Sequence, residues 1–233
     1  MASAILHIHK IFNNINIVQT MSDLRLAVLI ILVMLIILLF VKLFYNGSKV
    51  HFIINGEHYQ VAQEYADAFQ AANTMAKLND RILTFLRYLK KKYSAENAVG
   101  NMSNESPERM DVVQRILVGY NPEVLVENDP RFSKETAYTI NKGTKMMFCL
   151  RDRKTLKLHD VDTLLFVALH EISHIGNKAW EHGTDFWEIF KFVLKEANES
   201  GVYTPVNYAK ENIVYCGLTV TYNPYFDNSL RNI

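Results

Sequence analysis

Residues 170–187 read HEISHIGNKAWEHGTDFW. His170 and His174 stand four positions apart, so on a helix they share one face, with Cβ atoms about 5 to 6 Å apart. Two imidazoles at that spacing can reach one ion at about 2.0 to 2.1 Å. Glu171 would project beside the ion, where it can take a proton from water. The stretch therefore predicts one Zn²⁺ bound by His170 and His174, with Glu171 as the general base.

A catalytic zinc site needs a third protein ligand and one open position. His182 is the candidate for that ligand, because the chain can turn at Gly176 and bring its side chain back. An HExxH string also occurs by chance on ordinary helices, but the third histidine and the apolar helical context favour the metal site. Five other histidines have no comparable spacing: His7, His9, His51, His58 and His159.

Apolar periodicity predicts a helix on each side of His182. The first is expected over 159–176, and the second begins near Thr184-Asp185 and ends before Gly201. The apolar face of the first consists of Leu164, Leu165, Ala168, Leu169 and Ile172. That of the second consists of Phe186, Ile189, Phe190, Val193, Leu194 and Ala197.

Residues 46–130 are expected to form a β-hairpin, a long amphipathic helix and a loop. The hairpin joins 50–54 to 58–61 through Asn55-Gly56, a dipeptide that favours a type I′ turn. A helix of about thirty residues follows, and its basic end at Lys90-Lys91-Lys92 suits the helix dipole.

Residues 94–108 have the composition of an exposed loop, and a short helix is expected from Asp111. Two strands, 136–140 and 145–150, are expected around a turn at 141–143. Residues 146–150 of the second strand come just before the metal helix, so they are the candidate for binding an extended peptide by β-augmentation.

An apolar run covers residues 26–41, and the hydrophobic stretch continues to Tyr45 if Lys42 reaches toward the interface. Roughly twenty helical residues cross a hydrocarbon core of about 30 Å. We therefore expect an N-terminal tail over 1–23 and a transmembrane helix over 24–45. A cleaved signal peptide is disfavoured because bulky residues follow the run, and a buried soluble helix would need a larger globular core.

The orientation of this helix is nearly undetermined by its flanking charges. Lys10 and Arg25 lie on one side, and Lys42 and Lys49 lie on the other. If translation starts at Met21, Arg25 alone remains on the short side, which favours a cytosolic C-terminal domain.

The length of 233 residues suits one globular domain over 46–233 plus an appendage, with the zinc-binding core at 131–233. The formal net charge of +1 gives no reason to expect strong nucleic-acid binding. Cys149 and Cys216 form no CxxC pair, so they suggest neither a disulfide framework nor a thiolate zinc site, and their pairing stays open.

The run at 170–187 resembles the zinc signature of the WLM metalloproteases and their SprT relatives, in which HExxH precedes a third histidine in an HGxxFW-like segment. Further likeness to the WLM-like peptidases of large DNA viruses of algae and protists lies at 138–143, 149–151, 161–165, 205–208 and 215–217. The resemblance is strong over 131–233 and loose before it. A metzincin does not fit, since it would have Gly and His where Asn177 and Trp180 stand.

The resemblance implies an α+β, zincin-like metallopeptidase domain, in which a small antiparallel or mixed sheet packs on helices and one helix carries HExxH. It also implies that His170, His174 and His182 bind the single Zn²⁺ and that Glu171 is the catalytic acid/base. Together with the apolar helix, it predicts a single-pass protein of a host or virion membrane.

The expected function is a membrane-anchored zinc metallopeptidase that hydrolyses protein or peptide substrates with zinc-activated water. Phe186 and Trp187 are expected to pack beneath the site, and Tyr208 and Tyr215 are candidates for stabilising the oxyanion. One alternative is a structural or virion membrane protein that keeps zinc to stabilise its fold, although such a site would not need Glu171 and usually has a fourth ligand. The other, implied by the resemblance, is a DNA–protein crosslink protease, which the balanced charge disfavours.

Overall fold

The chain divides into two compact units, Met1–Tyr45 and Asn46–Ile233. The computed structural model describes residues 23–41, 48–94, 106–120, 125–140 and 145–233. In the first unit it describes one apolar helix, Asp23–Val41, which is long enough to cross a membrane. The expected N-terminal tail, the end of the transmembrane segment, most of the loop at 94–108 and the turn at 141–143 lie outside the described residues.

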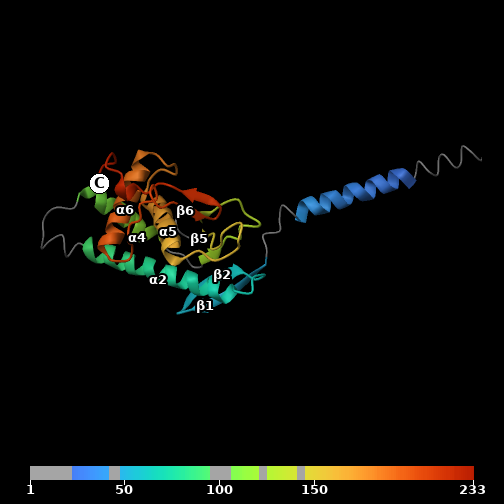
Figure 1. The fold of residues 1–233 in the computed structure, drawn as a ribbon, viewed down its shortest axis with the longest axis horizontal. Helices are drawn as coiled ribbons and strands as arrows, with labels where there is room; N and C mark the ends of the chain where they lie inside the picture. The colour runs from blue at the N-terminus through green and yellow to red at the C-terminus, as the bar shows by residue number, and fades with distance from the viewer. Residues whose placement is uncertain (1–22, 42–47, 95–105, 121–124, 141–144) are drawn as a thin grey trace, which may run out of the picture. The chain divides into compact units, whose positions relative to one another are not determined.

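The second unit is α+β, with a mixed sheet and several helices, as the sequence predicts (Figure 1). The strand order is β1-β2-β3-β5-β4, with antiparallel pairs at both ends and parallel pairs around β3. The strands are β1 (Lys49–Ile54), β2 (Glu57–Ala62), β3 (Leu125–Glu127), β4 (Ala137–Ile140) and β5 (Lys145–Phe148). Two strands therefore form the edges of this sheet, β1 and β4.

The hairpin of β1 and β2 confirms the turn expected at Asn55-Gly56. Asn55 has a φ of 54° and Gly56 a φ of 83°, and Ile54 pairs with Glu57 across the turn. Both φ values lie in the left-handed region that a type I′ turn requires. The strand β3 was not expected, because three residues are too few to show an alternating pattern.

Helix α5 (Val161–Gly176) contacts three other helices, α2 (Ala68–Lys92), α4 (Pro107–Gly119) and α6 (Thr184–Glu199). Figure 1 shows α5 in the middle of the unit, with α2 running along one side. Its N-cap is Asp160, whose carboxylate accepts from the N–H of Thr163 at 2.8 Å. The HExxH helix is thus held from several sides, which gives its histidines fixed positions.

One helix boundary differs from expectation. Helix α4 begins at Pro107 instead of Asp111, because Ser106 caps it by accepting from the N–H of Arg109 and Pro107 suits the first turn. Helix α6 begins at Thr184, as expected, with Gly183 as its N-cap and no side-chain cap.

Gly176 ends α5, as expected, but the reason is not a left-handed turn. The chain leaves the helix through Asn177 in an extended conformation. A Cβ on Gly176 would lie 3.2 Å from side-chain atoms of both Ile116 and Val112 in α4. The glycine therefore permits close packing of α4 on α5.

A separate two-stranded sheet, β6 (Ile213–Tyr215) and β7 (Leu218–Val220), was also not expected from the sequence. Its turn has left-handed φ values at Cys216 and Gly217. A disulfide joins Cys216 to Cys149, which directly follows β5. The open question of cysteine pairing is answered by this bond, which ties the small hairpin to the main sheet.

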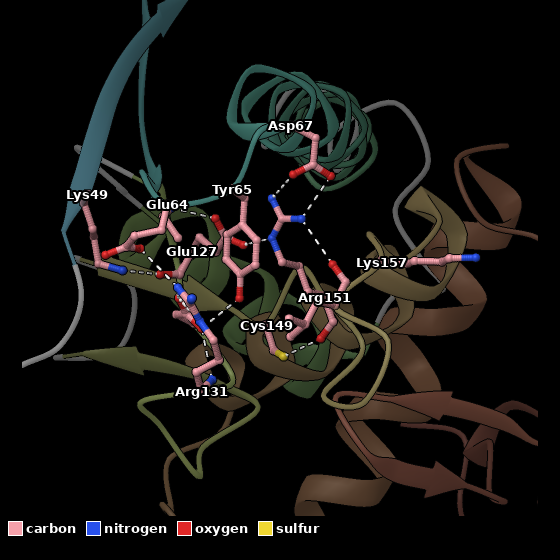
Figure 2. Close-up of polar contacts among 12 residues, drawn as sticks. Lys49, Glu64, Tyr65, Asp67, Glu127, Arg131, Cys149, Arg151 and Lys157 are labelled. Carbon is pink, nitrogen blue, oxygen red and sulfur yellow. Dashed lines mark hydrogen bonds and ion pairs between the residues drawn. The ribbon is translucent and has the colours of Figure 1, made fainter.

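The loops around β3 are held by a buried network of charged side chains (Figure 2). Arg151, 1% exposed, donates to the fully buried carboxylate of Glu127 at 2.8 Å and pairs with Asp67 at the same distance. Its guanidinium lies 3.8 Å from the ring centroid of Tyr65. The other carboxylate oxygen of Glu127 accepts from the N–H of Ala62 at 2.7 Å. Arg151 thereby links β3, β2 and the start of α2.

Candidate metal centre

Three histidine nitrogens converge at the end of α5. The Nε2 atom of His182 lies 3.0 Å from Nε2 of His170 and 3.0 Å from Nε2 of His174. All three ligand atoms lie within 4.8 Å of one another. His170 and His174 come from successive turns of α5, and His182 comes from the segment that leads into α6. The structure thus brings together the three residues singled out from the sequence.

Phe186 positions all three imidazoles. Its ring centroid lies 4.9 Å from that of His170, 4.3 Å from that of His174 and 4.6 Å from that of His182. Phe186 is fully buried on the first turns of α6. The expectation that it packs beneath the site is confirmed, and its burial explains how α6 holds the histidine loop in place.

The three imidazoles suit a divalent cation. A neutral imidazole has one N–H donor and one nitrogen with a lone pair. Three Nε2 atoms that point at one another therefore cannot all find a hydrogen-bond partner within the group. Burial, and then the neighbouring histidines, lower the pKa of His170 to about 3, which keeps its ring neutral at pH 7. Zinc prefers neutral imidazole nitrogens at about 2.0 to 2.1 Å, which places neighbouring ligand nitrogens about 3.3 Å apart. The two separations from His182, each 3.0 Å, are close to that value.

Glu171 lies beside the histidines and is only 6% exposed. Burial raises the pKa of its carboxyl to about 7, while a hydrogen bond from the backbone N–H of Thr139 opposes this shift. Glu171 lines the same cavity as the three histidines but is not among the converging ligand atoms. This is the place that a general base requires.

The edge strand β4 presents main-chain groups to this cavity. The N–H of Cys149 donates to the carbonyl of Thr136 at 2.7 Å, which sets the alternation of the β4–β5 ladder. The N–H and C=O groups of Tyr138 therefore point toward β5, while those of Ala137 and Thr139 point away from it. The bond from Thr139 to Glu171 agrees with this alternation.

The expectation that residues 146–150 bind a peptide is wrong. β5 is paired with β3 on one side and with β4 on the other, so its hydrogen-bonding groups are occupied. The described residues include no strand that pairs with the outer edge of β4. That edge is where an extended peptide can add.

An open cavity of about 620 Å³ lies over the histidines. Its lining comes from β4, α5, the segment before α6, α6 itself and the β6–β7 hairpin with the residues after it. The lining residues are Thr136, Ala137, Tyr138, Thr139, Phe166, Val167, His170, Glu171, His174, Trp180, His182, Trp187, Phe190, Tyr215, Leu218, Thr219, Val220, Thr221 and Tyr222. We refer to this cavity as the cleft.

The remaining candidate residues lie in different places. Tyr215 lines the cleft, and its hydroxyl donates to the carbonyl of Thr136 at 3.2 Å. Tyr208 instead packs edge-on against Phe166 with ring centroids 4.8 Å apart, and it is not among the lining residues. Trp187 is only half-buried and lines the cleft, so it does more than pack beneath the site.

The histidines without the motif spacing are outside the cluster. His159 accepts a hydrogen bond from the N–H of Cys216 at 3.1 Å and so supports the β6–β7 turn. His51 and His58 face each other across the β1–β2 hairpin with ring nitrogens 3.0 Å apart. His7 and His9 lie outside the described residues.

Sequence reasoning missed two contributions to the cleft, the backbone of Thr139 and the β6–β7 hairpin. The type of a residue does not reveal that its backbone N–H will act as a donor in a site. The hairpin had a weak one, because Cys216-Gly217 stands between two short apolar runs and glycine at that place favours a tight turn.

The chain is similar to uncharacterized viral proteins. One from Acanthamoeba polyphaga mimivirus is 29% identical over 202 residues, covering 87% of this chain and 96% of that protein. One from Invertebrate iridescent virus 6 is 36% identical over 69 residues, 29% of this chain and 38% of that protein. One from Invertebrate iridescent virus 3 is 33% identical over 84 residues, 36% of this chain and 51% of that protein. No family model and no solved structure matches the chain.

Proposed function

We propose that this protein is a membrane-anchored, zinc-dependent metallopeptidase of the zincin type. The observation that carries the proposal is the convergence of three Nε2 atoms, from His170, His174 and His182, beside the buried carboxyl of Glu171 in an open cleft. The resemblance to WLM and SprT-like metalloproteases includes the same residues.

In this proposal the three histidines hold the ion, and Glu171 moves the proton. When bound, zinc supplies the positive charge that activates water and polarises a scissile carbonyl. The carboxylate of Glu171 accepts a proton from the attacking water and returns it to the nitrogen of the leaving amine. The N–H of Thr139 holds that carboxylate in place.

Strand β4 binds the substrate in this proposal. The outward C=O groups of Ala137 and Thr139 and the N–H of Ala137 can pair with an extended peptide, which then runs along the cleft. Because those bonds use the main chain only, they hold peptides of many sequences. The same geometry keeps the peptide next to Glu171, since Thr139 contacts both.

The alternative of a structural zinc site is less well supported. Structural sites usually surround the ion with four protein ligands. In the described part of the chain, the cluster that could hold a metal has three members and opens onto the cleft. A buried glutamate beside it has no part in a purely structural site.

The helix Asp23–Val41 is proposed to anchor the protein in a host or virion membrane. The Cys149–Cys216 disulfide favours an oxidising environment for the globular unit, because such bonds are rare in the reducing cytosol. This is opposite to the cytosolic placement that a translation start at Met21 would favour. Protease protection of the globular unit in sealed membrane vesicles would decide between the two sides.

The test of the proposed function uses the full chain in detergent, prepared metal-free and then titrated with Zn²⁺. We expect one zinc ion per chain and hydrolysis of unfolded casein that a chelator abolishes. Glu171→Gln should bind zinc but lose hydrolysis. His182→Ala should weaken zinc binding by about a hundredfold or more, which corresponds to about 3 kcal/mol.

His51→Ala is the matched control, since it removes an exposed histidine of the β1–β2 hairpin. Its zinc affinity and activity should equal those of the wild type. Hydrolysis by Glu171→Gln at the wild-type rate would refute the role of Glu171 as general base, and failure of the wild type to hydrolyse casein would leave the structural role.

A further inference from the structure

We propose that the cleft selects peptides with a large apolar side chain next to the scissile bond and rejects charged ones. This inference depends on the proposed peptidase activity and names the substrate class of that site. It starts from the side chains that line the cleft, whereas main-chain binding by β4 is indifferent to the sequence of the peptide.

The cleft has a large apolar surface that is partly open to solvent. Phe166 and Phe190 form its buried base, at 6% and 1% exposure. Trp180, Leu218 and Tyr222 remain 66%, 58% and 40% exposed at its lining. Exposed apolar side chains gathered around one cavity are typical of a binding surface, because burying them against a ligand is favourable.

The aromatic part of this surface adjoins the metal centre. The rings of Trp187 and His182 have centroids 5.9 Å apart, and Trp187 packs edge-on against Tyr222 at 5.3 Å. The hydroxyl of Tyr222 donates to the carboxylate of Asp227 at 2.6 Å, which fixes the ring. An apolar side chain that contacts this pair therefore lies close to the reacting bond.

The charge of the cleft matches an uncharged ligand. Among the described residues that line it, none is Asp, Lys or Arg, and Glu171 is the single carboxylate. A charged side chain that enters the cleft would lose its hydration. Apart from the groups that take part in the reaction, the lining offers it no opposite charge. Nucleic acid would also lack the basic partners that its phosphates need.

The first experiment maps the cleavage sites. The zinc-loaded full chain in detergent digests unfolded casein, and mass spectrometry identifies the cut bonds. We expect Leu, Ile, Met or Phe beside the cut bond about tenfold or more above their frequency in casein, relative to Asp, Glu, Lys and Arg. Equal use of charged and apolar residues would overturn the inference.

The second experiment changes the cleft. Leu218→Lys places a positive charge in the lining and should lower kcat/KM for a peptide with an apolar residue at the preferred position by about tenfold or more. A peptide with Glu there should be cleaved faster than by the wild type. Val214→Lys is the matched control, because Val214 lies in the same hairpin at 52% exposure and does not line the cleft. Equal effects of the two substitutions would contradict the proposal.

A binding measurement separates this inference from the proposed activity. Fluorescence polarisation with labelled peptides reports their affinity for Glu171→Gln without turnover. If the wild type cleaves nothing but this variant binds the apolar peptide selectively, the peptidase proposal fails and the selectivity stands. If cleavage occurs without preference, only the selectivity fails. Cuts confined to the protein's own chain would also overturn it, since the occupant would then be a second copy.

Discussion

The backbone N–H of Thr139 opposes the rise in the pKa of Glu171 that burial causes. This interaction connects the edge strand β4 to helix α5, which carries His170 and His174, although the two residues are far apart in the sequence. It places the outward edge of β4 at a fixed position relative to the histidines. The candidate base and the candidate peptide-binding edge are therefore parts of one arrangement.

Replacing Thr139 with proline should lower the activity without lowering the stability of the fold. Proline removes the N–H that Glu171 accepts, and an outward-facing N–H on an edge strand is a position that tolerates proline. We expect kcat/KM for casein peptides to fall by about tenfold or more, with a melting temperature close to that of the wild type.

Two substitutions serve as controls for this prediction. Thr139→Val keeps the N–H and should remain active. Tyr138→Pro removes an N–H that faces β5 and should destabilise the fold. Full activity of Thr139→Pro would show that the hydrogen bond to Glu171 has no part in catalysis.

The Cys149–Cys216 disulfide should contribute strongly to stability. It joins residues 67 positions apart, and cross-linking a loop of that size stabilises by up to about 4 kcal/mol in the chain-entropy model. The Cys149→Ser, Cys216→Ser variant should therefore melt about 10 °C lower than the oxidised wild type in calorimetry. Dithiothreitol should lower the melting temperature of the wild type and leave that of the variant unchanged. Equal melting temperatures of the two proteins would mean that the bond does not form in solution.

The buried pair of Arg151 and Glu127 predicts a large cost for losing one partner. Arg151→Ala leaves a buried carboxylate without its counter-charge and should reduce the free energy of unfolding by about 3 to 5 kcal/mol. Adding Glu127→Gln should recover part of this loss by removing the charge. Arg81→Ala breaks the solvent-exposed pair with Asp162 and should cost about 1 kcal/mol or less. Urea unfolding of the four proteins measures these differences.

His159 predicts a dependence of stability on pH. Burial lowers its pKa, and nearby Asp152 and Asp160 oppose this shift. A histidine whose folded pKa is depressed binds fewer protons in the folded state, so stability falls as the pH drops below about 6.5 and stops falling below the folded pKa. Protonation would also remove the lone pair that accepts from the N–H of Cys216.

The measurement for His159 is urea unfolding between pH 8 and pH 5. His159→Asn should be less stable at pH 8 but should lose less stability than the wild type as the pH falls. An identical slope in both proteins would assign the pH dependence to other groups.

Local patterns in the sequence were sufficient for the elements with short-range causes. The turn at Asn55-Gly56 depends on the φ preferences of two residues, and the pairing of His170 with His174 on one face follows from helical geometry. The apolar helix at 23–41 follows from composition and length. The boundary of α4 was missed because its cap, Ser106, lies within a stretch that otherwise has the composition of a loop.

The sequence by itself determined which residue types could bind zinc and that two of them share a helix face, since a period of 3.6 residues is a local property. Only the tertiary structure decided the rest of the site. The position of His182 depends on Phe186 packing into the core, the use of Thr139 depends on which strand is at the edge of the sheet, and the lining of the cleft depends on a hairpin held by Cys149. Each of these rests on contacts between residues distant in the chain, which have no periodic signal in the sequence.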